Sequence, residues 1–112
     1  MVLDRWFTPA FQKNAPDVVA RTREMFVATD PAGYVAGCAA VRDMDQREMI
    51  HEIKVPTLIV SGTYDAVAPP AEGKFLAENI AEAKYLELPA AHLSNVETPA
   101  EFTAAVMGFL AG

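Results

Sequence analysis

The sequence predicts an α/β protein in which helices precede a βαβα unit with two parallel strands. Residues 57–61 (TLIVS) form an apolar, largely β-branched run that ends at a glycine, as strands buried in parallel sheets do. A second strand is predicted over 84–88 (KYLEL), and it stops at Pro89. Each of these runs is followed by a helix start at a proline, and everything before Val55 has helical spacing. Parallel strands need such a helical connection between them.

The helical part begins with a segment that opens at Pro16, with Asn14 as its expected cap. Its spaced residues are Val18, Thr22, Met25, Phe26 and Thr29. Asp30 and Pro31 then start a second helix, with the aspartate at the N-cap and the proline at the first helical position. Residues Tyr34, Cys38 and Val41 share one face of this helix. A third short helix is predicted over 45–53.

The chain divides near Val55 and Pro56 into residues 1–54, which are helical, and residues 55–112, which form the βαβα unit. A helix starting at Pro69 and Pro70 connects the strands. The sequence Thr98-Pro99-Ala100-Glu101 has the form of a capping box with proline at the first helical position, so it predicts the last helix. An apolar stripe follows on that helix, formed by Phe102, Val106, Phe109 and Leu110.

Composition narrows the classes of function. The 112 residues are 52% hydrophobic with a net charge of -6, which predicts a folded core and argues against nucleic acid and anionic membranes as partners. No apolar stretch approaches the roughly 18 residues of a membrane span. A single cysteine, Cys38, excludes an internal disulfide and suits a reducing compartment. A cytoplasmic protein is expected, with Cys38 buried in its helix as a small apolar residue.

Two residues stand out because they follow the predicted strands at the same distance. Asp65 lies four residues after Ser61, and His92 lies four residues after Leu88. Neighbouring parallel strands bring such positions to the same edge of a sheet. Alone, an aspartate there is more often a turn residue and a loop histidine more often a surface residue. Their matched placement favours an acid that orients a histidine for proton transfer, as in Ser-His-Asp hydrolases.

The sequence contains no serine in the arrangement that such a hydrolase needs. Its two serines, Ser61 and Ser94, both lie outside a Gly-x-Ser-x-Gly motif. A metal or nucleotide cofactor is not expected either, because there is no CxxC, HExxH or glycine-rich phosphate loop. His51 is isolated, and the acidic residues Asp43, Asp45 and Glu48 lie around a helix junction, where capping is the expected role.

Longer stretches of the sequence resemble a known family. Residues 53–110 resemble the carboxyl-terminal part of an α/β-hydrolase. The stretches DRWFTPAF, DPAGYVAGCAAVRDMD and AAHLSNVETP are similar to those of 3-oxoadipate enol-lactonases, which open an enol-lactone in the β-ketoadipate route of aromatic-acid catabolism. The resemblance implies that residues 1–54 derive from the cap of such an enzyme, and that 55–112 are the end of its core.

The same resemblance implies roles for individual residues. Asp65 becomes the acid and His92 the general base of a catalytic triad. Arg5 and Trp6 match an RW pair of the cap that faces the active site, where arginine binds a carboxylated lactone or ester and tryptophan excludes water. The alternatives are a solvated charge for Arg5 and a core anchor for Trp6. Leu93 is expected to touch the substrate.

The resemblance also implies that the nucleophile belongs to a part of the enzyme that is not in this chain. Two classes of function follow. The chain is the acid–base part of a lactone hydrolase, completed by an amino-terminal half, or it is a noncatalytic remnant that associates with itself. Within the first class, a related esterase or a haloperoxidase-like hydrolase is the alternative to the lactonase. A homodimer is expected for the isolated chain, because two strands leave open edges that recruit other strands.

Overall fold

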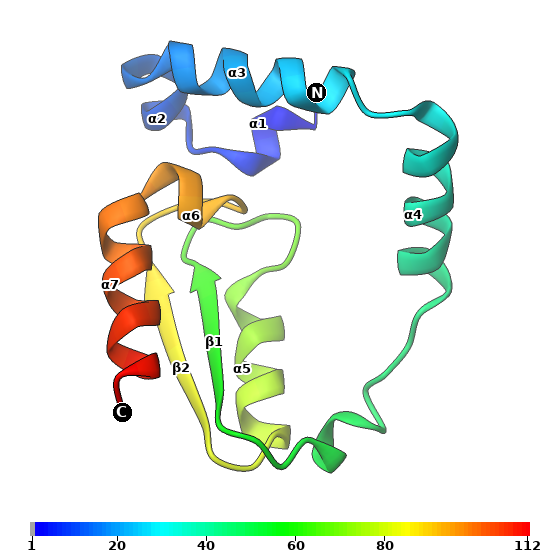
Figure 1. The fold of residues 1–112 in the computed structure, drawn as a ribbon, viewed down its shortest axis with the longest axis vertical. Helices are drawn as coiled ribbons and strands as arrows, with labels where there is room; N and C mark the ends of the chain where they lie inside the picture. The colour runs from blue at the N-terminus through cyan, green and yellow to red at the C-terminus, as the bar shows by residue number, and fades with distance from the viewer. Residues whose placement is uncertain (1) are drawn as a thin grey trace.

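A computed structural model describes residues 2–112, and Figure 1 shows its arrangement. The helices before the sheet are α1 (Leu3–Trp6), α2 (Pro9–Asn14), α3 (Pro16–Val27), α4 (Pro31–Asp43) and the 3₁₀ turn η1 (Ile50–Glu52). The remaining elements are β1 (Thr57–Gly62), α5 (Pro70–Asn79), β2 (Ala83–Leu88), α6 (Ser94–Glu97) and α7 (Pro99–Leu110). The order confirms a helical segment followed by a βαβα unit.

The two strands form a parallel sheet that aligns their ends. Thr57 pairs with Ala83 at one end and Gly62 with Leu88 at the other, without a register shift. Because the register is even, the loops after β1 and β2 leave the sheet at the same level. The second edge of β1 is unpaired among the described residues.

Helices cover both faces of this small sheet. Gly73 of α5 lies so close to the hydroxyl of Ser61 and the ring of Tyr85 that a Cβ there would collide with both. Successive side chains of a strand point to opposite faces, so Lys84 points away from the face of Tyr85. On that second face, Nζ of Lys84 lies 5.9 Å from the ring centre of Phe109 on α7. The result is three layers, α5, sheet and α7.

Helices α1, α2 and α3 lie over the carboxyl ends of the strands, whereas α4 stands to one side of the sheet and η1 lies near its opposite end (Figure 1). Aromatic rings connect them. Phe26 of α3 meets Trp6 edge-on with ring centres 5.1 Å apart, and it meets Tyr34 of α4 in the same way at 5.3 Å. Phe7, which is 1% exposed, stacks on Phe11. Helices α1, α2 and α3, called the roof helices below, therefore cover the edge of the sheet at which Asp65 and His92 lie.

The predicted helix starts are largely confirmed at the prolines. Asp30 caps α4, with its carboxylate accepting from the backbone N–H of Ala32 at 3.2 Å. Asn14 is not the cap of α3, however. A separate helix begins at Pro9 after Thr8, ends at Asn14, and leaves Ala15 as the N-cap of α3 without a side-chain bond.

Three local expectations were wrong. The helix over 45–53 is only the short η1, because Asp45 binds the backbone and guanidinium of Arg47 and forms a turn instead. Thr98 precedes α7 but does not cap it, since its hydroxyl donates to the carbonyl of Ser94 at 2.9 Å. Cys38 is exposed, because α4 packs on no sheet face that would cover it.

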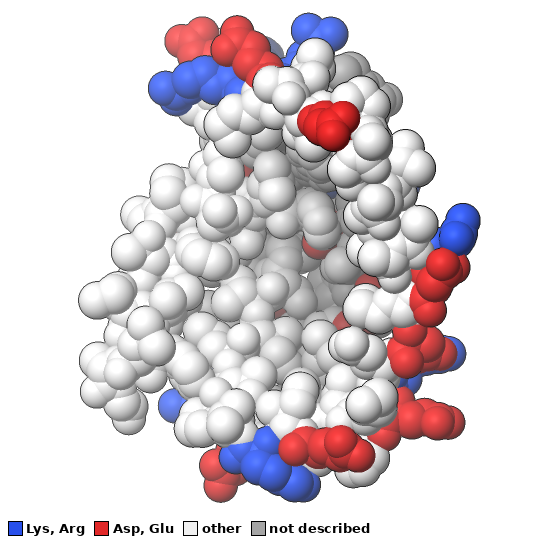
Figure 2. Space-filling view, turned by 45° about the vertical axis from the view of Figure 1, so that its right-hand side comes forward, with Lys and Arg blue, Asp and Glu red and all other residues white. Residues whose placement is uncertain are grey.

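The chain exposes more surface than a self-contained domain of its size. Its accessible area is 7772 Å², against about 6000 Å² for a folded monomer of this mass. Its radius of gyration is 15.5 Å, against about 13 Å for a compact domain of this length. Figure 2 shows a hollow in the face on which α4 comes forward, with uncharged side chains around it and most charged ones at the rim. No helix in the described chain has the length and hydropathy to cross a membrane.

Candidate active site

Asp65 and His92 meet at the carboxyl edge of the sheet, as the matched spacing predicted. Nδ1 of His92 lies 2.9 Å from Oδ2 of Asp65. The aspartate is buried, with 9% of its surface exposed, whereas the histidine is only half-buried. A buried acid that holds a histidine open to its surroundings is the arrangement of an acid–base pair.

The carboxylate of Asp65 is held in its ionised form. Oδ1 accepts hydrogen bonds from the backbone N–H groups of Val67 at 2.8 Å and Ala68 at 3.0 Å. Burial pushes the pKa of Asp65 upward, but the hydrogen bonds from Ala68, His92 and Val67 outweigh burial and leave this pKa below its ordinary value. Asp65 therefore carries a negative charge at neutral pH and accepts from the N–H at Nδ1 of His92.

A close backbone approach brings the two loops together. The backbone N–H of Tyr64 donates to the carbonyl of Ala90 at 3.0 Å, just beyond the paired strands. At Gly62 a Cβ would collide with the carbonyl oxygens of Ala90 and Ala91, so only glycine permits this approach. Gly62 thus sets the separation between the loop of Asp65 and the loop of His92.

In the neutral tautomer that donates from Nδ1 to Asp65, Nε2 of His92 is a hydrogen-bond acceptor. None of the described residues forms a hydrogen bond with Nε2. His92 and Asp65 both line a cavity of about 230 Å³. The lining also contains a second acidic residue, Glu72, together with Ile59, Val60, Ser61, Gly62, Ala68, Gly73, Leu76 and Ser94. An alcohol that entered within hydrogen-bond distance of Nε2 would find a general base there.

The serines of the chain are placed for packing. Ser61 is buried in β1, and its hydroxyl lies against Gly73 of α5. Ser94 is buried at the first position of α6. Neither hydroxyl forms a hydrogen bond with His92.

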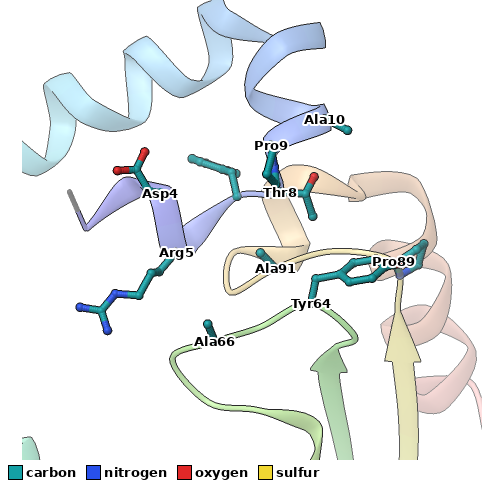
Figure 3. Close-up of a pocket in the computed structure, with 10 residues that line it drawn as sticks. Asp4, Arg5, Thr8, Pro9, Ala10, Tyr64, Ala66, Pro89 and Ala91 are labelled. Carbon is teal, nitrogen blue, oxygen red and sulfur yellow. The ribbon is translucent and has the colours of Figure 1, made fainter.

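Arg5 lines a different cavity from the one that holds Asp65 and His92. This cavity has a volume of about 470 Å³ and lies between the α1–α2 segment and the loops after the strands (Figure 3). Tyr64 and Ala66 come from the loop after β1, and Pro89 and Ala91 from the loop after β2. Figure 3 shows the exposed Arg5 side chain extending away from Tyr64, while Asp65 and His92 are not among the lining residues.

Trp6 and Leu93 are joined through their main chains. The backbone N–H of Leu93 donates to the carbonyl of Trp6 at 3.0 Å, so the loop of His92 is bonded to the segment that contains Arg5 and Trp6. Both side chains are half-buried, and the Trp6 ring packs on Phe26. The structure therefore brings the two segments together and places Trp6 within an aromatic cluster.

Sequence reasoning missed one part of the site, the carboxylate of Glu97. It accepts from the backbone N–H of Thr8 at 2.9 Å and from the Thr8 hydroxyl at 2.8 Å. These residues are 89 positions apart, so no local pattern links them. The one available signal was Thr8-Pro9, which has the form of a helix start.

In the part of the chain that the structure describes, no group of three His, Cys, Asp or Glu side chains has an arrangement that could hold a metal ion.

The parallel strands and the acid and histidine after them define an α/β-hydrolase core, seen here as its carboxyl-terminal part. A family model described as "Serine hydrolase (FSH1)" matches residues 23–96, and the chain belongs to this family.

Relatives agree with the resemblance seen in the sequence. The 3-oxoadipate enol-lactonase 2 of Acinetobacter baylyi is 36% identical over 102 residues, which are 91% of this chain and 38% of the relative. The crystal structure of the enol-lactonase from Burkholderia xenovorans LB400 matches 99% of this chain and 43% of its own, with a TM-score of 0.97 and 46% identity. A hydrolase from Pseudomonas aeruginosa PA01 matches with a TM-score of 0.93 and 44% identity, over 99% of this chain and 42% of its own. The chain spans about two fifths of the length of each of these three proteins.

Proposed function

We propose that this chain supplies the acid and the base of a serine hydrolase that opens 3-oxoadipate enol-lactone in aromatic-acid catabolism. The observation that carries the proposal is the 2.9 Å contact between Nδ1 of His92 and Oδ2 of Asp65, at a cavity that both residues line. The similarity to enol-lactonases supports the choice of substrate.

The proposed reaction needs a serine from outside these 112 residues. Nε2 of His92 takes the hydroxyl proton as the serine oxygen bonds to the lactone carbonyl carbon. Collapse of the tetrahedral intermediate breaks the ring C–O bond, and the imidazolium returns its proton to the leaving enol oxygen. Water then gives a proton to His92 as its oxygen bonds to the acyl carbon, the bond between that carbon and the serine oxygen breaks, and the imidazolium returns the proton to the serine oxygen. Asp65 stays ionised throughout and stabilises the imidazolium.

Arg5, Trp6 and Leu93 are proposed to bind the substrate. Arg5 is an exposed guanidinium beside a cavity that opens next to the histidine loop, and such a group suits the carboxylate of the lactone. Trp6 and Leu93 join the roof of the site to that loop. Comparing KM for Arg5→Ala with KM for the parent measures the proposed contribution of Arg5.

The nucleophile is proposed to arrive on an amino-terminal hydrolase half that packs against β1. That strand has an open edge in the described structure, and the exposed area exceeds that of a compact monomer by about 1800 Å². An excess of this size on one partner fits a large obligate interface. The exposed single Cys38 fits a reducing compartment, so we place the assembly in the cytoplasm.

The experiment that tests this function combines the purified chain with an amino-terminal half that contains Gly-x-Ser-x-Gly. The chain alone should not open the lactone above background, whereas the mixture should, because only the mixture holds nucleophile and base. Turnover by the chain alone that disappears in His92→Ala would contradict the proposal. Cleavage of simple esters without cleavage of the lactone would place the assembly among related esterases.

The alternative, a noncatalytic chain that associates with itself, is favoured by the apolar surface. Exposed apolar side chains include Met25, Val27, Val35, Val41, Met107 and Leu110. Without the other half, we propose that two copies cover each other as a homodimer. Sedimentation at micromolar concentration should give twice the 12.1 kDa chain mass. A compact, cooperatively unfolding monomer would contradict this expectation.

A further inference from the structure

The carboxylate of Glu97 connects the roof of the site with the loop of the histidine. Its Oε2 accepts the Thr8 hydroxyl at 2.8 Å and its Oε1 the Thr8 N–H at 2.9 Å. Oε1 also lies 3.5 Å from the backbone nitrogen of Ala91. Glu97 is the last residue of α6, and Thr8 is the N-cap of α2. One side chain therefore holds groups from the beginning and the end of the chain.

The residues before and after His92 both have backbone N–H groups that are connected by hydrogen bonds to segment 6–8. The N–H of Ala91, before it, is directed at Glu97 and through Glu97 reaches Thr8. The N–H of Leu93, after it, donates directly to the carbonyl of Trp6. Residues 6–8 are themselves held by Phe7, which is buried. The main chain at His92 thus depends on segment 6–8 as well as on its own loop.

We propose that Glu97 is a positioning residue, which fixes the loop of His92 against segment 6–8 and so sets the imidazole against Asp65. The inference rests on the proposed function, because only there does the position of His92 affect turnover. A displacement of about 1 Å in a catalytic group can lower a rate by about 100-fold. Glu97 needs no contact with substrate to have such an effect.

The hydrogen bonds of Glu97 make different replacements unequal. Glutamine keeps one oxygen for the N–H groups of Thr8 and Ala91, and its amide can donate to the Thr8 hydroxyl. Alanine offers no acceptor and leaves these donors unpaired. Aspartate keeps the charge but is one methylene shorter, so it cannot reach both segments. A matched control is Glu101→Ala, which removes the same charge from an exposed side chain in the first turn of α7.

The test measures kcat and KM of the completed hydrolase, and also the NMR signal of the Nδ1 proton of His92 in this chain. Glu97→Ala should lower kcat by about 10- to 100-fold, with KM changed far less. Its Nδ1 proton should shift and exchange faster. Glu97→Asp should act similarly, whereas Glu97→Gln and Glu101→Ala should stay close to the parent in both measurements.

Two outcomes would overturn the inference. The first is that a folded Glu97→Ala variant keeps the parental kcat and the parental NMR signal of the Nδ1 proton. If alanine prevents folding, the same result for a folded Glu97→Asp variant counts instead. The other is a folded Glu97→Gln variant that is as damaged as Glu97→Ala. If nothing turns over in any variant, while the Nδ1 proton still depends on Glu97, the positioning of His92 stands and the proposed function fails.

Discussion

Replacing His92 with alanine is expected to lower kcat of the completed hydrolase by about a millionfold, the size of effect seen when a triad base is removed. The imidazole lines the cavity beside Asp65 and is bonded to that carboxylate through Nδ1, so alanine leaves a nucleophilic serine without the proposed base. Single-turnover kinetics with the lactone, at saturating amino-terminal half, measure the loss.

The other histidine of the chain provides the control for this experiment. His51 is exposed in η1, away from the carboxyl edge of the sheet, so His51→Ala should retain parental kcat. Sedimentation must show that His92→Ala still binds the amino-terminal half. Parental turnover by an assembled His92→Ala variant would rule out His92 as the base.

Asp65→Asn should lower kcat by about 10,000-fold, mainly by changing the tautomer of His92. An amide nitrogen in place of Oδ2 donates to Nδ1, which moves the imidazole proton to Nε2 and removes the base. The variant keeps the size of the side chain and one oxygen for the N–H groups of Val67 and Ala68, so it should fold. Asp43→Asn, at an exposed residue, is the matched control.

The same replacement should change how stability depends on pH. The pKa of Asp65 is lowered in the folded state, so its ionised form stabilises the fold above the unfolded pKa of about 4. This stabilisation is lost as pH falls through the folded pKa. Urea unfolding of the parent between pH 7 and pH 3 should contain this contribution, and Asp65→Asn should lack it. Equal pH dependence, together with parental kcat, would show that Asp65 is not the acid.

Local sequence was sufficient for the elements of the βαβα unit. Strand β1 extends only one residue beyond 57–61, and β2 begins one residue before 84–88. Proline at the first helical turn marked α4, α5 and α7, because its fixed φ and missing N–H act within one turn. These preferences depend on immediate neighbours, and the fold did not override them.

Local sequence failed where two structures competed for the same groups. The hydroxyl of Thr98 had a choice between capping α7 and bonding back to Ser94, and α6 decided the outcome. Asp45 turned the chain toward Arg47 where a helix was expected. Cys38 was expected to be buried, but the burial of a helix face depends on what packs against it, and helical spacing alone cannot identify that neighbour.

The sequence by itself determined that Asp65 and His92 would meet. Each residue lies four positions after the run predicted as its strand, and β1 and β2 pair in parallel without a register shift, so the two positions come close together. Only the tertiary structure decided how they are held. The close approach at Gly62 and the hydrogen bonds that Thr8 donates to Glu97 join residues that are far apart along the chain and share no periodic pattern. Such contacts exist only after the roof helices have packed on the carboxyl edge of the sheet. A hydrogen bond needs its two atoms to lie about 3 Å apart, and the separation of two residues along the sequence does not determine their distance in space.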